Sequence, residues 1–219
     1  MTKVIGFIGS DKYDFISYIG KILSGLGKKV LLVDYTALRS LMSTIPDYID
    51  SRTMQYKELF YLGNPGIGEI EEMIQNEEYD FILMDFDYSV MRRDAFLCHK
   101  LVFITDVQRH HLEVLESMKL SKNIQKYLVL KMEYRNRKAS AYLKQIRKNM
   151  EIQEERCFYY TWGDRERRNQ LRSQYYYEIS WKRCSSTTKK IILYLVHEFL
   201  EVPKNQNSLS IPIQAGQVG

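Results

Sequence analysis

Short runs of apolar residues alternate along the chain with longer stretches in which apolar residues recur every three or four positions. An unbroken apolar run of this length predicts a buried strand, and the wider spacing predicts a helix with one apolar face. The predicted strands cover residues 3–8, 30–34, 80–85, 101–105, 127–130 and 157–160. The predicted helices cover residues 13–26, 69–78, a stretch after 105 that ends near 118, 139–150 and 188–201.

Strand, helix and strand follow one another within the first 34 residues. Two strands joined in this way lie parallel, because the intervening helix returns the chain to the same end of the sheet. We therefore expect an α/β fold, a doubly wound and mostly parallel sheet of about six to eight strands with helices on both faces. Residues 35–78 are less regular, and 61–68 resemble a loop. Residues 1–202 are predicted to form one domain, followed by a flexible polar tail at 203–219.

Composition supports a cytoplasmic protein. Hydrophobic residues make up 45% of the 219 positions, enough for a sizeable core. The longest apolar runs stay short of the roughly 18 residues that span a bilayer, and the N-terminus enters a strand pattern without a signal-peptide pattern. Three widely spaced cysteines disfavour a disulfide framework.

In sheets of this kind, ligands bind beyond the carboxyl ends of the strands. Asp34 and Asp85 each end a predicted strand, and the loop after the first strand reads Gly-Ser-Asp-Lys-Tyr-Asp over residues 9–14. These three positions are the candidate site.

The same segments resemble the MinD/ParA family of P-loop ATPases, which carry a deviant Walker A loop. Residues 3–41 resemble the family's opening strand, phosphate loop, helix and second strand ending in Asp34. Residues 79–85, Tyr-Asp-Phe-Ile-Leu-Met-Asp, resemble its Walker B strand, and 99–105 resemble the strand that follows. The order of elements matches over nearly the whole chain. The resemblance implies ATP and Mg²⁺ as cofactors.

The phosphate loop departs from the family pattern. When the sequences are aligned from the end of the helix that follows the loop, the loop is about four residues shorter than the loop of the family. This alignment places Lys12 at the P-loop lysine and Tyr13 where a Ser or Thr would hold Mg²⁺. Asp11 and Asp14 add negative charge where phosphates would lie. The sequence therefore predicts an eroded ATP site.

Two further family positions are altered. Thr36 replaces the second Asp, and the adenine-contacting Asn falls near Lys131. We expect Lys12, Tyr13, Asp34 and Asp85 to be vestigial nucleotide-site positions. Lys12 is expected to be an exposed loop lysine, and the two aspartates to be strand-end carboxylates that accept hydrogen bonds from loop N–H groups. The sequence predicts no catalytic residue, metal site or cofactor; the alternative is ATP with Mg²⁺.

Residues 119–190 hold 19 lysines and arginines against 7 acidic residues, whereas residues 1–118 hold 12 against 18. A solvated face, a protein interface and a nucleic-acid surface all fit such a basic segment, in which arginines alternate with aromatic residues. The candidate nucleic-acid or partner-binding residues are Arg135, Arg137, Lys138, Lys144, Arg147, Lys148, Arg165, Arg167, Arg168 and Arg172.

Three functions remain open. The first is a non-catalytic scaffold or localisation factor for a larger machine of the pilus, secretion or partition type, similar to degenerate relatives in pilus assembly and polar localisation. The second is an ATP-binding dimeric switch, and the third is a partition or regulatory protein that binds DNA non-specifically. The expected partners are a protein of a larger assembly, a second copy in a homodimer, or DNA, with membrane association only through a partner. The C-terminal helix is expected to pack on the core and not to target a membrane.

Overall fold

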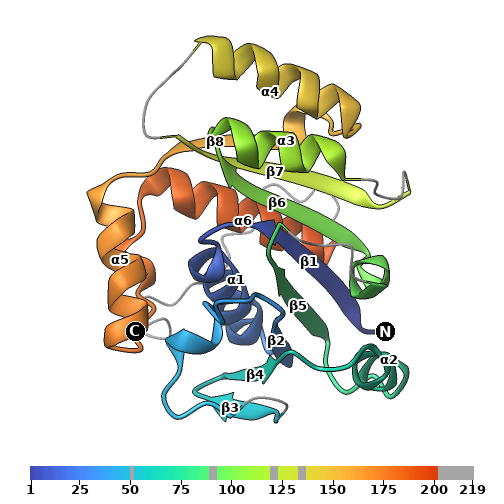
Figure 1. The fold of residues 1–219 in the computed structure, drawn as a ribbon. Helices are drawn as coiled ribbons and strands as arrows, with labels where there is room; N and C mark the ends of the chain where they lie inside the picture. The colour runs from blue at the N-terminus through green and yellow to red at the C-terminus, as the bar shows by residue number, and fades with distance from the viewer. Residues whose placement is uncertain (50–51, 89–92, 119–122, 133–136, 202–219) are drawn as a thin grey trace.

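The structure, a computed structural model, describes residues 1–49, 52–88, 93–118, 123–132 and 137–201, and its centre is an eight-stranded sheet (Figure 1). The strand order is β3-β4-β2-β5-β1-β6-β7-β8, and every pairing is parallel except that between β3 and β4. This confirms the predicted doubly wound, mostly parallel α/β fold. The strands are β1 (Lys3–Gly9), β2 (Val30–Asp34), β3 (Met54–Tyr56), β4 (Leu59–Gly63), β5 (Phe81–Phe86), β6 (Lys100–Asp106), β7 (Gln125–Met132) and β8 (Cys157–Thr161).

Helices cover both faces of the sheet. One face packs against α1 (Tyr13–Gly25) and α6 (Ser186–Leu200), and the other against α2 (Ile67–Gln75), α3 (Arg109–Ser117) and α4 (Arg137–Asn149). α5 (Asp164–Tyr175) stands at the edge where the strands end, beside the start of α1 (Figure 1). Short 3₁₀ turns lie at Met42–Thr44 (η1), Arg93–Leu97 (η2), Glu154–Arg156 (η3) and Trp181–Arg183 (η4).

Residues 59–75 correct the sequence interpretation. Part of the stretch expected to be a loop is strand β4, whose Leu59, Tyr61 and Leu62 are buried, and β3 pairs with it as an antiparallel edge strand. Parallel pairing with β2 holds β4 in the sheet. Of the residues that suggested a loop, Gly63 ends β4, Pro65 and Gly66 lie in the turn before α2, and Gly68 belongs to the first turn of α2.

The C-terminal helix α6 packs on the core, as predicted. It buries Ile191, Ile192, Leu195, Val196 and Phe199 against the sheet and α1, and Ser185 accepts a hydrogen bond from the Thr188 N–H at its start. The predicted tail at 203–219 lies outside the described residues. Within the described ranges, no helix has the length and apolarity needed to cross a membrane.

The register of the sheet places the candidate site. Asp34 at the end of β2 lies opposite Asp85 on β5, and Gly9 at the end of β1 lies opposite Ile104 on β6. Both aspartates and the β1–α1 loop therefore meet at the carboxyl edge of the sheet, as the topology predicted.

Candidate functional site

The β1–α1 loop, residues 10–12, leaves the sheet in close contact with β6. Gly9 has φ +134°, and a Cβ atom at this position would lie 1.9 Å from the carbonyl oxygen of Ile104. The N–H of Ser10 donates to that same carbonyl at 3.3 Å. Glycine is required here because any side chain would collide with the neighbouring strand.

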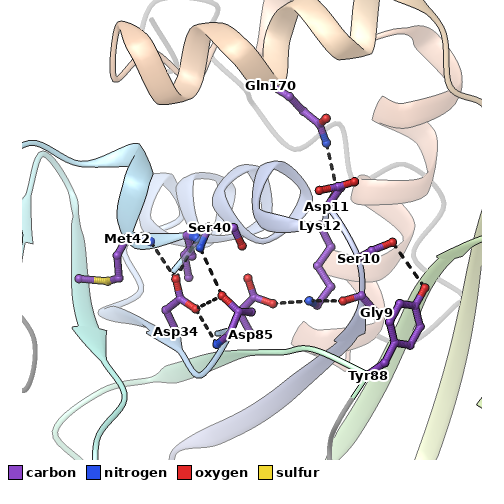
Figure 2. A network of polar contacts seen from close by, with 12 residues as sticks. Gly9, Ser10, Asp11, Lys12, Asp34, Ser40, Met42, Asp85, Tyr88 and Gln170 are labelled. Atoms are coloured by element: carbon purple, nitrogen blue, oxygen red, sulfur yellow. Dashed lines mark hydrogen bonds and ion pairs between the residues drawn. The ribbon is translucent and has the colours of Figure 1, made fainter. Parts of the chain in front are cut away.

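Lys12 is buried, so the expectation of an exposed loop lysine is wrong. Its side chain is 2% exposed, and its Nζ lies 2.5 Å from Oδ1 of Asp85, whose side chain is 0% exposed (Figure 2). The same ammonium donates to the carbonyl oxygen of Gly9 at 2.8 Å. The lysine folds back under its own loop because a buried carboxylate and a buried carbonyl stabilise its charge there.

Asp85 sits in a strongly desolvated position. Burial raises its pKa from 3.8 to about 6, while Lys12 lowers the pKa and Asp34 raises it. Apart from the ion pair with Lys12, the carboxylate accepts no hydrogen bond from the described residues. Lys12 is therefore the contact that supports a charged Asp85 in this core.

Asp34 accepts hydrogen bonds from loop N–H groups, as predicted for a strand-end carboxylate. The same prediction is wrong for Asp85, whose side chain pairs with Lys12 and accepts no N–H hydrogen bond from the described residues. The two oxygens of Asp34 accept four hydrogen bonds over 2.6–2.9 Å, from the N–H groups of Leu41, Met42 and Thr36 and from the Thr36 hydroxyl (Figure 2). Asp34 and Thr36 thus organise the loop that leads into η1.

Tyr13, at the position of the family's magnesium ligand, is part of the hydrophobic core. It is 4% exposed and belongs to the cluster formed by α1, α6 and the sheet. Burial raises the pKa of its phenol, and a hydrogen bond to Ser173 on α5 lowers it. A neutral phenol held in this way is a poor ligand for a hard cation.

The β1–α1 loop is held through its carbonyl groups. Lys131 at the end of β7 donates to the carbonyl oxygens of Ser10 and Asp11. Gln170 on α5 donates to the carbonyl oxygen of Asp11 at 3.0 Å (Figure 2). Together with the contact between Lys12 and Gly9, three consecutive carbonyls, from Gly9 to Asp11, accept hydrogen bonds from long side chains. A phosphate-binding loop has the opposite polarity, since it directs its N–H groups inward.

Asp14 occupies the first turn of α1, the position at which a helix attracts an anion. Burial raises the pKa of Asp14, and Lys131 and Gln170 oppose that shift. Burial likewise lowers the pKa of Lys131, which Asp14 and Asp11 oppose. The positive end of α1 and the cation of Lys131 therefore already face a carboxylate that belongs to the chain.

A pocket of about 420 Å³ lies beside this loop. Trp162, which follows β8, forms part of its wall, with Arg167 stacked 4.6 Å from the ring centre and Nζ of Lys131 at 5.5 Å. The lining residues are Ser10, Asp11, Asp106, Val107, Gln108, Lys131, Trp162 and Arg167.

The candidate basic residues are divided between two helices. Arg137, Lys138, Lys144, Arg147 and Lys148 belong to α4, whereas Arg165, Arg167, Arg168 and Arg172 belong to α5; Arg135 lies outside the described residues. α4 lies beside α3 on one face of the sheet, and α5 stands at the carboxyl edge (Figure 1). Arg147 and Arg172 form ion pairs with Glu154 and Glu178, both at 2.9 Å.

The part of the site that sequence reasoning missed comes from α5. Its buried residues, Glu166, Gln170 and Ser173, are all polar. Their spacing of four and three was the available signal. It was not recognised because helices are usually identified by an apolar stripe at that spacing.

Comparison with solved structures identifies proteins that share the fold of this chain. No protein-family model matches the chain, and no curated protein matches it in sequence. Among solved structures, the chain resembles MinD of Aquifex aeolicus in a MinC:MinD complex, with a TM-score of 0.66, 15% identity, and coverage of 94% of this chain and 99% of that one. It also resembles a ParA family ATPase from Chlorobium tepidum TLS (TM-score 0.64, 16% identity, coverage 89% and 97%). The pNOB8 ParA bound to nonspecific DNA matches with a TM-score of 0.51 at 13% identity, over 92% and 98% of the two chains.

Proposed function

Because the chain has the fold of the MinD/ParA ATPases, we propose that it is a pseudo-ATPase, a non-catalytic scaffold or localisation factor for a larger cellular machine. The observation that carries this proposal is the Lys12–Asp85 ion pair, in which both side chains are buried. The lysine that would contact the outer phosphates is occupied by a carboxylate of its own chain.

The residues at the site do not fit a magnesium nucleotide. Lys12, Lys131 and Gln170 donate to the three carbonyl oxygens of the β1–α1 loop, so these donors are already engaged and are not directed at a polyphosphate. Asp11 and Asp14 lie on that loop and on the first turn that follows it. A like charge at about 4 Å costs on the order of 4 kcal/mol at an effective dielectric of about 20.

The scaffold role is supported by surface chemistry and by the fold. The described surface carries exposed arginines on α5 and exposed tyrosines at its C-terminal end, residue types that are enriched at protein interfaces. Among proteins of this fold, the MinD of Aquifex aeolicus is known in complex with a protein, MinC. The pNOB8 ParA is bound to nonspecific DNA, so DNA is the second candidate partner.

Calorimetry with Mg-ATP and Mg-ADP on the full chain tests the loss of the nucleotide site. We expect no binding tighter than about millimolar, and no hydrolysis above that of a buffer control. A complete MinD/ParA ATPase measured in parallel is the positive control. Micromolar binding by the wild-type chain would overturn the proposal and favour the dimeric ATP switch.

Duplex DNA titrated at two salt concentrations tests the alternative partner. DNA binding through α5 requires an affinity that falls steeply with salt, with a log–log slope of about −0.9 per phosphate neutralised. Reversing the charges of Arg165, Arg167 and Arg168 together would flatten that slope. If the chain is a protein scaffold, we expect weak binding that this triple variant leaves unchanged.

A further inference from the structure

α5 is an amphipathic helix in the reverse of the usual orientation. Its inward face consists of Glu166, Gln170 and Ser173, which are all buried. A helix on the surface of a globular protein normally buries its apolar stripe and exposes its polar face. Here the polar face is buried against the β1–α1 loop and α1, through contacts that include the hydrogen bond from Gln170 to Asp11.

The opposite face of α5 carries the apolar side chains. Leu171 is 54% exposed and Tyr175 75% exposed, and both share a stripe with Arg168 at spacings of three and four residues. Tyr176, which ends the helix, is 67% exposed. The packing of the fold gives no reason for a leucine and two tyrosines here, and clustered exposed apolar side chains mark interaction sites.

We propose that the outward face of α5, formed by Arg168, Leu171, Tyr175 and Tyr176, binds an acidic amphipathic helix of another protein. Leu171 and the tyrosines provide apolar contacts for such a helix, and the arginines provide charge-assisted hydrogen bonds to its carboxylates. α5 contains four arginines and no lysine. That composition is typical of protein interfaces, which favour arginine and tyrosine and contain little lysine.

The details of α5 fit a protein better than a nucleic acid. Arg165 donates to the carbonyl oxygen of Arg183 at 2.6 Å, and Arg172 is paired with Glu178, so part of the positive charge is already engaged. Leu171 offers a phosphate or a base neither a hydrogen bond nor a stacking surface.

The contacts of the inner face of α5 fix the position of the outer face. Gln170 and Ser173 fix the helix to the eroded loop and to Tyr13, so the outward side chains sit on an ordered platform. A platform that is ordered before binding reduces the entropy that a partner must overcome. The inference rests on the proposed scaffold function for the existence of a partner, but not on the absence of nucleotide binding.

Fluorescence anisotropy with three labelled probes tests the proposal on the full chain. The first probe is a helical peptide of about 18 residues with leucines at i, i+3 and i+7 flanked by glutamates. The second is a scrambled peptide of the same composition, and the third is a duplex of about 20 base pairs. We expect the ordered peptide to bind at least about tenfold more tightly than the scrambled one, and the duplex to bind more weakly still.

Variants locate the contact. Leu171→Ala/Tyr175→Ala and, separately, Arg168→Glu should each weaken peptide binding by about tenfold or more. Phe96→Ala in η2 removes an exposed aromatic (65% exposed) ahead of β6, at the other end of the strands. Lys28→Glu reverses a charge ahead of β2, also at that end. Neither should change the affinity. Circular dichroism checks that each variant is folded.

The remaining outcomes all overturn the proposal. They are equal binding of the ordered and scrambled peptides, no peptide binding, affinity unchanged in the α5 variants, or binding of the duplex alone. Nucleotide calorimetry on the same preparation is a separate result. Micromolar ATP binding would refute the pseudo-ATPase function without affecting the peptide result, and loss of peptide binding would leave the nucleotide result unchanged.

Discussion

Replacing Lys12 with methionine removes the ammonium that contacts Asp85 while keeping most of the buried volume. At an effective dielectric of about 20, two unit charges 2.5 Å apart attract by about 7 kcal/mol, much of which offsets their desolvation. Removing one partner of a buried pair typically costs about 3–5 kcal/mol, because the other charge is left uncompensated. We therefore expect Lys12→Met to lower the free energy of unfolding by about 3–5 kcal/mol, a large part of the stability of an ordinary domain.

Urea unfolding followed by circular dichroism measures this loss as a lower midpoint with an unchanged slope. The matched control is Lys144→Met on α4, an exposed lysine whose loss should change stability by no more than about 0.5 kcal/mol. The double variant Lys12→Met/Asp85→Asn, which carries no unpaired charge, should recover about 2 kcal/mol relative to Lys12→Met. The single variant should also regain stability as the pH falls, because protonation removes the unpaired charge of Asp85. Without Lys12, which lowers the pKa of Asp85, this protonation occurs at a higher pH than in wild type, above about 6.

A loss below about 1 kcal/mol in Lys12→Met, similar to that of the Lys144→Met control, would refute the reasoning. It would mean that Lys12 and Asp85 do not support each other in the folded chain. The ion pair could then no longer carry the proposed loss of the nucleotide site.

Three further predictions concern the same edge of the sheet. The raised pKa of Asp85, about 6 against 3.8, means that the folded chain binds this proton more tightly than the unfolded chain. Protonation of Asp85 therefore contributes about 3 kcal/mol to the free energy of unfolding, complete below about pH 4 and lost as the pH rises through about 6. The difference in the free energy of unfolding between wild type and Asp85→Asn, measured by urea titration, should change across that window. Asp34→Ala leaves buried N–H groups without acceptors and should cost about 3 kcal/mol, measured by thermal unfolding, whereas a loss below about 1 kcal/mol would contradict the capping role. Gly9→Ala should cost about 4 kcal/mol or more, seen as insoluble or unfolded protein, because its Cβ would collide with the carbonyl of Ile104; a variant as stable as wild type would show that β1 and β6 can separate.

The parallel strands other than β4 could be predicted because each contains an unbroken apolar run. The meeting of Asp34 and Asp85 followed from the topology alone, since both end parallel strands of one sheet. β4 was misread because its five residues run directly into a turn rich in glycine and proline, and only pairing with β2 identifies it as a strand.

The burial of Lys12 could not be read from its neighbours. The local sequence Ser-Asp-Lys-Tyr-Asp over residues 10–14 is polar and is typical of an exposed loop. Its environment comes from residues far away in the chain, from Asp85 on β5, Lys131 on β7 and Gln170 on α5. A single sequence gives the local preference of such a loop but not the long-range contacts that override it.

The contacts of Lys12 and Lys131 also bear on whether a nucleotide site could arise at this position by mutation. A chain that regained a longer, glycine-rich loop would have to release Lys12 from Asp85 and the loop carbonyls from Lys131 and Gln170 at the same step. A change that separates Lys12 from Asp85 alone leaves a buried charge unpaired, at a cost of about 3–5 kcal/mol against a total stability of about 5–15 kcal/mol. Single-residue reversions would therefore pass through poorly folded intermediates. Under the proposed pseudo-ATPase function, the loss of the site would be hard to reverse, because residues at the nucleotide-site positions now hold the loop and the sheet edge together.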